Sequence, residues 1–254
     1  MSSYKLVTYQ SPKGPRAGIV VDEKLFDAAA LTRKAAYASM LDIINDWSSA
    51  KGTLKKAAAA AAKSKLKSSP VAKAKLLPPV MYPSAIYCAG ANYTDHMMEM
   101  AKLQGIPPAP DPHDVGLKPW HFIKASRTVV GDKATVKLPA ASKAIDWEAE
   151  LGAVIGKKAK HLTEANAMDC VFGYTIGNDV SERSWQKADR GLWRAKNADT
   201  FKPMGPWIET NVDLDQMETV IRVNGKETGR FRTNDMIFGI VPFLIELTRY
   251  FTLW

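Results

Sequence analysis

Short segments in which hydrophobic and polar residues alternate recur along much of the chain, and this alternation is typical of β-strands. Near the N-terminus, residues 4–21 contain two such segments around a Pro/Gly turn, which predicts a hairpin. Helical patterns follow at about residues 32–47 and 53–67. The Ser/Pro-containing sequence at 68–79 cannot continue a helix, so we expect a small N-terminal α/β module over residues 1–80.

After residue 80 the pattern changes to many short β-type segments with few helices between them. The predicted strands cover residues 84–90, 120–125, 134–138, 146–155, 171–179, 207–210, 218–223 and 227–232. The predicted helices cover residues 93–104, 163–169, 181–186 and 235–250, the last with Asn234 as its N-cap. The Asn224–Gly225 turn favours a hairpin between the last two strands. We therefore predict an α+β fold whose second domain, residues 81–254, is a β-rich roll or barrel.

The net charge of +9 on the 254 residues is local. Residues 51–75 hold eight lysines and no acidic residue, so the rest of the chain carries +1. This segment has no aromatic residue on which a base could stack, and its composition favours a solvated helix and linker. We expect no nucleic-acid partner. A Lys-rich anion-binding or nucleic-acid-binding protein is the non-enzyme alternative.

The sequence also limits where the protein can act. Its longest hydrophobic segment, Met236–Phe251, is interrupted by a proline and two charged residues, so no membrane partner is expected. The N-terminus lacks the apolar core of a signal peptide. Two cysteines, Cys88 and Cys170, cannot build a disulfide framework, and we expect both to be buried thiols. These features predict a cytoplasmic location.

One acidic segment stands out after the common catalytic motifs are excluded. The chain has no Gly-x-Ser-x-Gly elbow, no Walker loop, no His-Glu-x-x-His and no cysteine pair at zinc spacing. In the predicted strand 146–155, Glu148 and Glu150 are two residues apart and should point to the same side. Two close carboxylates favour a compensating divalent cation. A solvated strand face that bears two glutamates is the alternative.

Other residues extend this candidate chemistry. Asp179 ends the predicted strand 171–179, where it would either cap the next helix or supply a third carboxylate for Mg²⁺ or Mn²⁺. His96 and Glu99 are one helical turn apart in the predicted helix 93–104. This spacing lets the carboxylate orient the imidazole as a base, and a surface ion pair is the alternative.

The order of these segments resembles the fumarylacetoacetate hydrolase family. The resemblance runs over roughly residues 84–250, and five collinear motifs are more specific than any one alone. The motifs are Tyr93-x-x-His96-x-x-Glu99; Asp146-Trp147-Glu148-x-Glu150-Leu151; Gly173-Tyr174-Thr175 through Asn178-Asp179-Val180-Ser181-x-Arg183 and Gln186; Lys196 with Asp199-Thr200-Phe201-x-Pro203-x-Gly205-Pro206-Trp207; and Val223-Asn224-Gly225-Lys226.

The resemblance implies a mixed β-roll fold of the fumarylacetoacetate hydrolase type and a Mg²⁺ or Mn²⁺ cofactor held by Glu148, Glu150 and Asp179. Members of the family act on 1,3-dicarbonyl or 2-oxo acids and commonly form homodimers. The family pattern continues beyond the final helix with a Pro-Gly-Asp run and a Gly-Thr-rich loop, whereas this sequence stops at Trp254. We therefore expect a C-terminal segment to be lacking here.

The resemblance also implies roles for the remaining site residues. His96 with Glu99 would act as the base, and Arg183, Gln186 and Lys196 would contact substrate or metal-bound oxygens. The leading hypothesis is hydrolytic carbon-carbon cleavage of a β-diketo acid of the acylpyruvate or fumarylpyruvate type, with Lys196 stabilising the oxyanion or protonating the leaving carbon. A decarboxylase, an isomerase or tautomerase, or a hydratase acting on a 2-oxo acid through the same metal-enolate is the alternative. A non-catalytic interaction module is a third interpretation.

Overall fold

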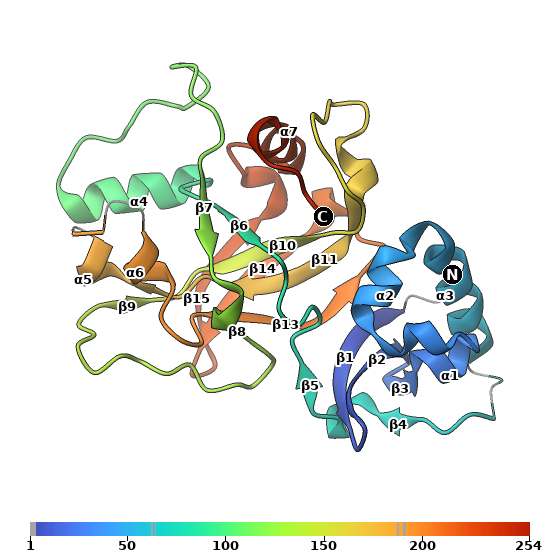
Figure 1. Cartoon of the computed structure of the whole chain (residues 1–254). Coiled ribbons are helices and arrows are strands. Elements are labelled where there is room, and N and C mark those ends of the chain that lie inside the picture. The colour runs from blue at the N-terminus through green and yellow to red at the C-terminus, as the bar shows by residue number, and fades with distance from the viewer. Residues whose placement is uncertain (1–3, 62, 64, 187, 190–191) are drawn as a thin grey trace.

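The computed structural model describes residues 4–61, 63, 65–186, 188–189 and 192–254. Within this part of the chain, nine strands form one large sheet (Figure 1). The main path through the sheet runs β10, β11, β13, β1, β2, β3 and β4, with β5 beside β1 and β8 beside β13. Their bounds are β1 Lys5–Ser11, β2 Gly14–Val21, β3 Lys24–Asp27, β4 Ser69–Pro70, β5 Leu76–Leu77, β8 Val129–Val130, β10 Ala149–Ile155, β11 Val171–Asn178 and β13 Lys202–Glu209.

The N-terminal strands belong to this same sheet. β1 and β2 form the predicted hairpin, with Lys5 opposite Val20 and Ser11 opposite Gly14. On its other side β1 pairs antiparallel with β13, where Leu6 lies opposite Ile208. Strands from both sides of the domain boundary predicted near residue 80 therefore belong to one hydrogen-bonded sheet.

Three helices pack on the N-terminal strands: α1 Ala28–Thr32, α2 Met40–Asn45 and α3 Trp47–Ala61. The prediction of one helix over 32–47 was wrong, because a 3₁₀ turn and two shorter helices occupy this region. The helix predicted at 53–67 begins earlier, and residues 62 and 64 lie outside the described residues. The expectation of a solvated helix holds for one face only: Ala59 and Ala60 are exposed, whereas Ala57, Ala58 and Ala61 are buried in the main core.

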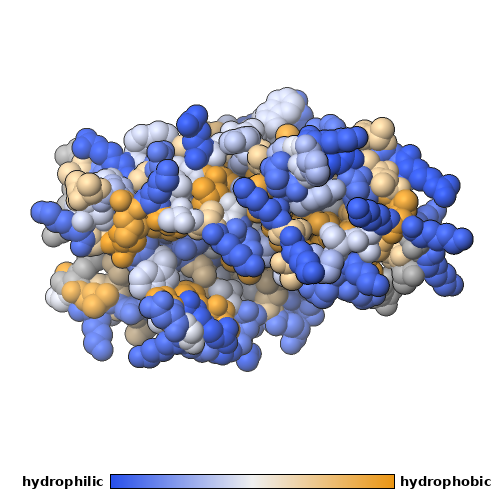
Figure 2. Space-filling model, turned by 90° about the horizontal axis from the view of Figure 1, so that it is seen from below, coloured by the Kyte–Doolittle hydropathy of each residue, from blue (hydrophilic) through white to orange (hydrophobic). Residues whose placement is uncertain are grey.

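The core beneath these helices joins the N-terminal helices to the strands of the second half. Trp47 packs against Phe172 of β11, with 4.2 Å between the ring centroids. All eight lysines of residues 51–75 are exposed. In Figure 2 hydrophilic side chains cover much of the face seen from below, and separate hydrophobic patches lie between them. The basic segment therefore lies at the surface while its apolar residues contribute to the core.

The remaining strands form short pairs around the end of the large sheet that holds β10. These are β6 Ile86–Ala89 with β7 His121–Lys124, β9 Ile145–Asp146 with β12 Ser181–Glu182, and β14 Glu218–Val223 with β15 Lys226–Arg232. The helices of this half are α4 Thr94–Gln104, α5 Arg183–Gln186, α6 Trp193–Lys196 and α7 Ile240–Tyr250. Figure 1 shows the β6–β7 pair crossing in front of the sheet. The predicted mixed fold of strands and helices is confirmed. The described strands do not close into a barrel, which was one of the two arrangements predicted.

Several predicted elements differ from the structure. Residues 134–138 form no strand and are mostly exposed, because their alternating pattern has no buried face to pack against. The last helix begins at Ile240 with Gly239 as its N-cap; Asn234 instead lies in a separate 3₁₀ turn, Thr233–Asp235. The helix predicted at 163–169 is reduced to a 3₁₀ turn, Ala167–Cys170, and the strand predicted at 207–210 starts earlier, at Lys202.

The described chain has no helix with the length and hydrophobicity needed to cross a bilayer. Both cysteines are free and buried, as predicted. Burial raises the pKa of the Cys88 thiol to about 12, which keeps it protonated at neutral pH.

Candidate active site

The three carboxylates predicted as metal ligands come together where β10 begins and β11 ends. Ala149 and Asn178 are opposite each other in this antiparallel pair, so Glu148, Glu150 and Asp179 fall at the same end of the sheet. The Asp179 amide donates to the Glu148 carbonyl at 2.8 Å, and the Glu148 amide donates to the Asn178 side chain at 3.1 Å. Backbone pairing therefore fixes the relative positions of these acids.

The predicted strand 146–155 is interrupted at this point. β9 ends at Asp146 and β10 begins at Ala149, so Glu148 lies in the break rather than in a continuous strand. The simple alternation that placed Glu148 and Glu150 on one face does not hold through this break. Their carboxylates are near each other because β11 and Asn178 hold the backbone of Glu148 in place.

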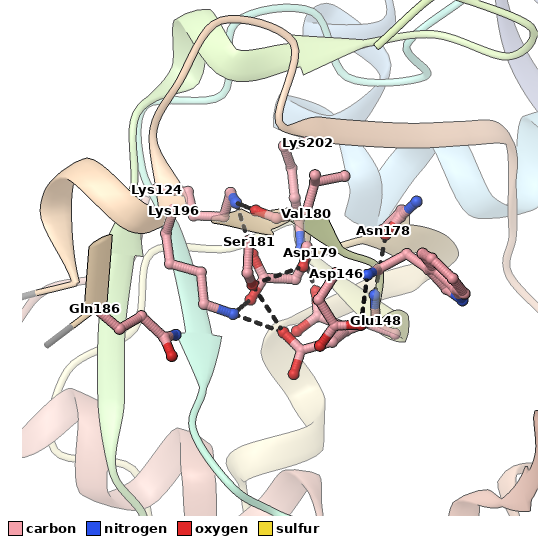
Figure 3. Close-up of polar contacts among 12 residues, drawn as sticks. Lys124, Asp146, Glu148, Asn178, Asp179, Val180, Ser181, Gln186, Lys196 and Lys202 are labelled. Atoms are coloured by element: carbon pink, nitrogen blue, oxygen red, sulfur yellow. Dashed lines mark hydrogen bonds and ion pairs between the residues drawn. The ribbon is translucent and has the colours of Figure 1, made fainter. Parts of the chain in front are cut away.

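Four basic side chains neutralise the acids of this site, and Figure 3 labels three of them, Lys124, Lys196 and Lys202. The Lys196 ammonium lies between two carboxylates: it is 2.6 Å from Glu148 Oε2 and also donates to Asp179. On its other oxygen, Asp179 accepts from Lys124 Nζ at 2.6 Å. The remaining pairs are Lys202 with Glu150, and Arg183 with Glu148 at 2.8 Å and with Asp146 at 2.5 Å.

Lys124 and Lys202 were not identified from the sequence. Both are almost fully buried, Lys124 on β7 and Lys202 at the start of β13. The available signal was a lysine at the end of an otherwise hydrophobic segment, as in His121–Lys124. A buried ammonium needs a partner of opposite charge, so a lysine in such a segment indicates a nearby buried acid.

Burial and the neighbouring charges shift the pKa values of several groups in this cluster. Burial disfavours the carboxylate of Glu148, but Lys196 and Arg183 outweigh this effect and lower its pKa. Burial likewise opposes the charged form of Lys196, and Asp179 and Glu148 outweigh it and raise the pKa of this ammonium. For Lys124 burial prevails over the pairing with Asp179, and its pKa is lowered. Glu148 and Lys196 therefore stay charged near neutral pH.

A cavity of about 2080 Å³ opens above this cluster. Its lining includes seven of the eight predicted site residues, together with Lys202; these seven are His96, Glu99, Glu148, Glu150, Arg183, Gln186 and Lys196. Asp179 is not part of the lining and is only 1% exposed, so it lies beneath the cavity floor. The wall of the cavity is therefore rich in charged groups on the side of β10.

The imidazole of His96 on α4 points to the sheet and not to Glu99. His96 Nε2 lies 3.6 Å from Glu148 Oε1, whereas Glu99 is exposed. Among the described residues Glu99 makes no hydrogen bond or ion pair with His96. The structure therefore offers Glu148 as the carboxylate beside the imidazole, and the paired role of His96 and Glu99 stays a prediction.

Gln186 ends α5 one helical turn after Arg183. Its Oε1 lies 3.5 Å from Arg183 Nη1, which is at the limit of a hydrogen bond. Both side chains line the cavity, so the amide of Gln186 stays available to a ligand.

The buried carboxylate of Glu182 links the residues on either side of Arg183 to the loop at residues 142–144. This carboxylate accepts hydrogen bonds from Ser142 and from the amides of Lys143, Ala144 and Ser184. Burial opposes its charge, but these hydrogen bonds outweigh burial and lower the pKa of Glu182 to about 2. Glu182 therefore fastens the loop before β9 to the turn that carries Arg183, a function that the sequence did not reveal.

The donor set is chemically suited to a hard divalent cation. Glu148 and Asp179 already share one cationic centre, the Lys196 ammonium, and their ligand atoms are carboxylate oxygens of the kind that Mg²⁺ and Mn²⁺ prefer. In the described part of the chain, however, no three His, Cys, Asp or Glu side chains are arranged to hold a metal ion. Each carboxylate instead faces lysine or arginine, so the assignment of Glu148, Glu150 and Asp179 as ligands stays a prediction.

Comparison with known proteins agrees with this architecture. The family model described as fumarylacetoacetate (FAA) hydrolase C-terminal matches residues 85–254. The oxaloacetate tautomerase fahd2, mitochondrial, of Xenopus laevis is 38% identical over 183 residues, which are 70% of this chain and 54% of the relative. This chain spans about half to two thirds of the length of the curated relatives that it matches at 38% identity.

Two solved structures share the fold over nearly the whole chain. Maleylpyruvate hydrolase from Sphingobium sp. SYK-6, in complex with manganese(II) ion and pyruvate, superposes with a TM-score of 0.75 at 26% identity and covers 98% of this chain and 84% of its own. For 2-hydroxyhepta-2,4-diene-1,7-dioate isomerase from Mycobacterium marinum, the TM-score is 0.71 at 28% identity, over 99% of this chain and 83% of that one. The family model, the relatives and the shared fold together show that this chain belongs to the fumarylacetoacetate hydrolase family.

Proposed function

We propose that this protein is a divalent-metal-dependent hydrolase that cleaves a carbon-carbon bond in a β-diketo acid of the acylpyruvate or fumarylpyruvate type. The observation that carries the proposal is the imidazole of His96, 3.6 Å from Glu148, at a cavity lined by Glu148 and Glu150 with Asp179 buried beneath it. An imidazole beside carboxylates that could hold a divalent cation is an arrangement suited to water activation.

In this proposal Glu148, Glu150 and Asp179 would hold a Mg²⁺ or Mn²⁺ ion, which would supply Lewis acidity towards the substrate's carbonyl oxygens. His96 takes a proton from a water molecule in the cavity, and Glu148 stabilises the imidazolium that forms. Attack of this water on the acyl carbonyl gives a tetrahedral adduct, its collapse breaks the bond to the methylene carbon, and the leaving enolate takes up the proton held by His96 to become pyruvate. The products are a carboxylic acid and pyruvate, and one water is consumed for each molecule cleaved.

Lys196 and Arg183 supply positive charge for this reaction. Because its two carboxylate partners raise the pKa of Lys196, this ammonium holds its proton firmly. It is therefore better suited to stabilise a developing oxyanion than to protonate the leaving carbon. Arg183 and Gln186 present a guanidinium and an amide to the cavity, where they would bind the substrate's carboxylate.

Tautomerase or isomerase activity on a 2-oxo acid is the second candidate. It is favoured by the oxaloacetate tautomerase name of a 38% identical relative and by the isomerase name of a structural neighbour. This reaction needs only proton transfer between carbon and oxygen, which His96 could perform without attack by water. The two activities use the same residues and differ in whether a carbon-carbon bond breaks.

Product analysis separates these candidates. The enzyme with Mg²⁺ or Mn²⁺ is incubated with acylpyruvates, oxaloacetate and a hydroxydienoate, and loss of the enol absorbance is followed while products are identified. Pyruvate plus a carboxylic acid supports hydrolysis, whereas interconversion without cleavage supports the tautomerase. His161→Asn serves as the matched histidine control for His96→Ala, because His161 is exposed and asparagine tolerates its positive φ of 53°. Turnover that persists in EDTA would refute metal dependence.

Assembly as a homodimer and a cytoplasmic location stay predictions. The tautomerase relative carries "mitochondrial" in its name, which is a statement about that protein. Light scattering of the purified protein tests the dimer directly, and a mass of one 27.9 kDa chain would refute it.

A further inference from the structure

Lys202 and Glu150 form an ion pair inside the candidate metal site. The Lys202 side chain is 4% exposed, and its ammonium is paired with Glu150 Oε2. Among the described residues, Glu150 is its one hydrogen-bonding partner. The pair lies over Gly177 of β11, which is opposite Glu150 in the sheet. A Cβ at Gly177 would be 3.3 Å from Lys202 Nζ, so glycine leaves the space that the lysine needs.

The site is already neutral without a metal ion. Four acids, Asp146, Glu148, Glu150 and Asp179, are paired with four basic groups, Lys124, Lys196, Lys202 and Arg183. A divalent ion would add two positive charges to a poorly solvated cluster that has no unpaired acid to receive them. Positive charge at such short range opposes a second cation strongly, because little water screens it.

Lys202 differs from the other two lysines in its connections. Lys196 bridges Glu148 and Asp179, and Lys124 joins Asp179 to the carbonyl of Val180. Lys202 serves Glu150 alone, and both side chains of this pair line the cavity. It is therefore the lysine whose displacement frees a whole carboxylate for an incoming ion.

Building on the proposed function, we propose that Lys202 is an internal counter-ion of Glu150 that competes with the divalent metal for this carboxylate and so weakens metal binding. The lysine keeps the acidic cluster charge-balanced while no metal is bound. Metal affinity then depends on how easily the ammonium leaves Glu150.

Binding of Mn²⁺ alone, read from the electron paramagnetic resonance signal of the free ion, tests this proposal without reference to activity. Lys202→Met keeps most of the lysine's length and removes its charge. We expect it to bind Mn²⁺ about tenfold or more tightly than the wild-type protein. Lys158→Met is the matched control: Lys158 lines the same cavity, but its ammonium lies 3.9 Å over the ring of Trp254. This control should bind Mn²⁺ as the wild type does.

Equal or weaker Mn²⁺ binding by Lys202→Met would overturn the proposal, and so would equal tightening in Lys158→Met. Because Lys202→Met leaves Glu150 unpaired, its melting temperature is measured with and without Mn²⁺, and the expected shift on adding Mn²⁺ is larger than for the wild type. If this variant does not fold, Lys202→Gln is titrated and judged by the same criterion. If neither the wild-type protein nor the Lys202 variants bind Mn²⁺, both this proposal and the proposed function are refuted. Wild-type binding that is lost in Glu148→Gln, with no tightening in the Lys202 variants, would refute this proposal alone.

Discussion

Replacing Lys124 by methionine should destabilise the fold by about 2–4 kcal/mol. The Lys124 side chain is 0% exposed, and its ammonium donates to Asp179 Oδ1 at 2.6 Å and to the Val180 carbonyl at 3.2 Å. Leaving a buried charge with no partner costs about 3–5 kcal/mol. Here the cost is lower because Asp179 keeps its contact with Lys196. Methionine fills the volume of the lysine stem, so little of the loss comes from a cavity.

Urea unfolding followed by circular dichroism measures this loss, and thermal unfolding provides a second reading. For a chain of this size one kcal/mol corresponds to about 2 °C, so the melting temperature should fall by roughly 4–8 °C. Lys55→Met is the matched control, because Lys55 is exposed on α3 and should change stability by less than about 0.5 kcal/mol.

A double-mutant cycle with Asp179→Asn and the double variant Lys124→Met/Asp179→Asn measures the coupling between the two groups. Removing the acid as well should restore part of the lost stability, because the uncompensated charge is gone while Lys196 still has Glu148. If Lys124→Met unfolds at the same urea concentration as Lys55→Met, the ammonium does not stabilise the buried carboxylate. Strict additivity of the two substitutions would also refute the reasoning, because it would mean that the two groups are not coupled.

Three further substitutions test the site. His96→Ala should lower kcat/KM about 10²- to 10⁴-fold, or roughly 3–5 kcal/mol, while Mn²⁺ affinity is retained; near-wild-type turnover would remove His96 from the mechanism. Glu148→Gln should weaken Mn²⁺ binding in the same titration, and unchanged affinity would exclude it as a ligand. The pKa of Glu182 is about 2 in the folded protein and ordinarily about 4.5, so its stabilising effect is complete above 4.5 and is lost as the pH falls from 4.5 towards 2. Glu182→Gln should therefore be less stable at neutral pH and should lose less stability on acidification, and identical stability curves would contradict this role.

Local signals in the sequence predicted the parts of the fold that local interactions determine. The hairpin of β14 and β15 followed from Asn224–Gly225, since this turn sequence fixes strand pairing without information from the rest of the chain. The strands β6, β7 and β11 were found in their predicted places. The exposed segment at 134–138 has a similar pattern, and only the absence of a neighbouring buried face prevents it from forming a strand.

The sequence led to the acidic residues of the site and, through the family resemblance, to Lys196 and Arg183, but not to Lys124 and Lys202. Glu148, Glu150 and Asp179 fall at the ends of two strands that follow each other in the sequence. Antiparallel pairing of these strands is enough to place the three acids at one end of the sheet. The burial of Lys124 and Lys202 depends on how β7 and β13 pack, so the hydrophobic residues before Lys124 were only a weak signal in the sequence. Helical spacing predicted Glu99 as the partner of His96, and the contact of His96 with Glu148 could not be predicted in this way. Such contacts leave no periodic signal.

The position of β13 connects the N-terminal strands to the chemistry of the site. β13 lies between β11, which leads into Asp179, and β1, which belongs to the N-terminal hairpin. Its first residue is Lys202, so the placement of this ammonium beside Glu150 depends on the register of a strand that is hydrogen-bonded on both sides. Without β1, the far end of β13, at Ile208 and Glu209, would present an unpaired edge, while Lys202 at the other end pairs with Val129 of β8. We infer that residues 1–80 support the site indirectly, through the pairing of β1 with β13, although none of the predicted catalytic or metal-binding side chains belongs to them.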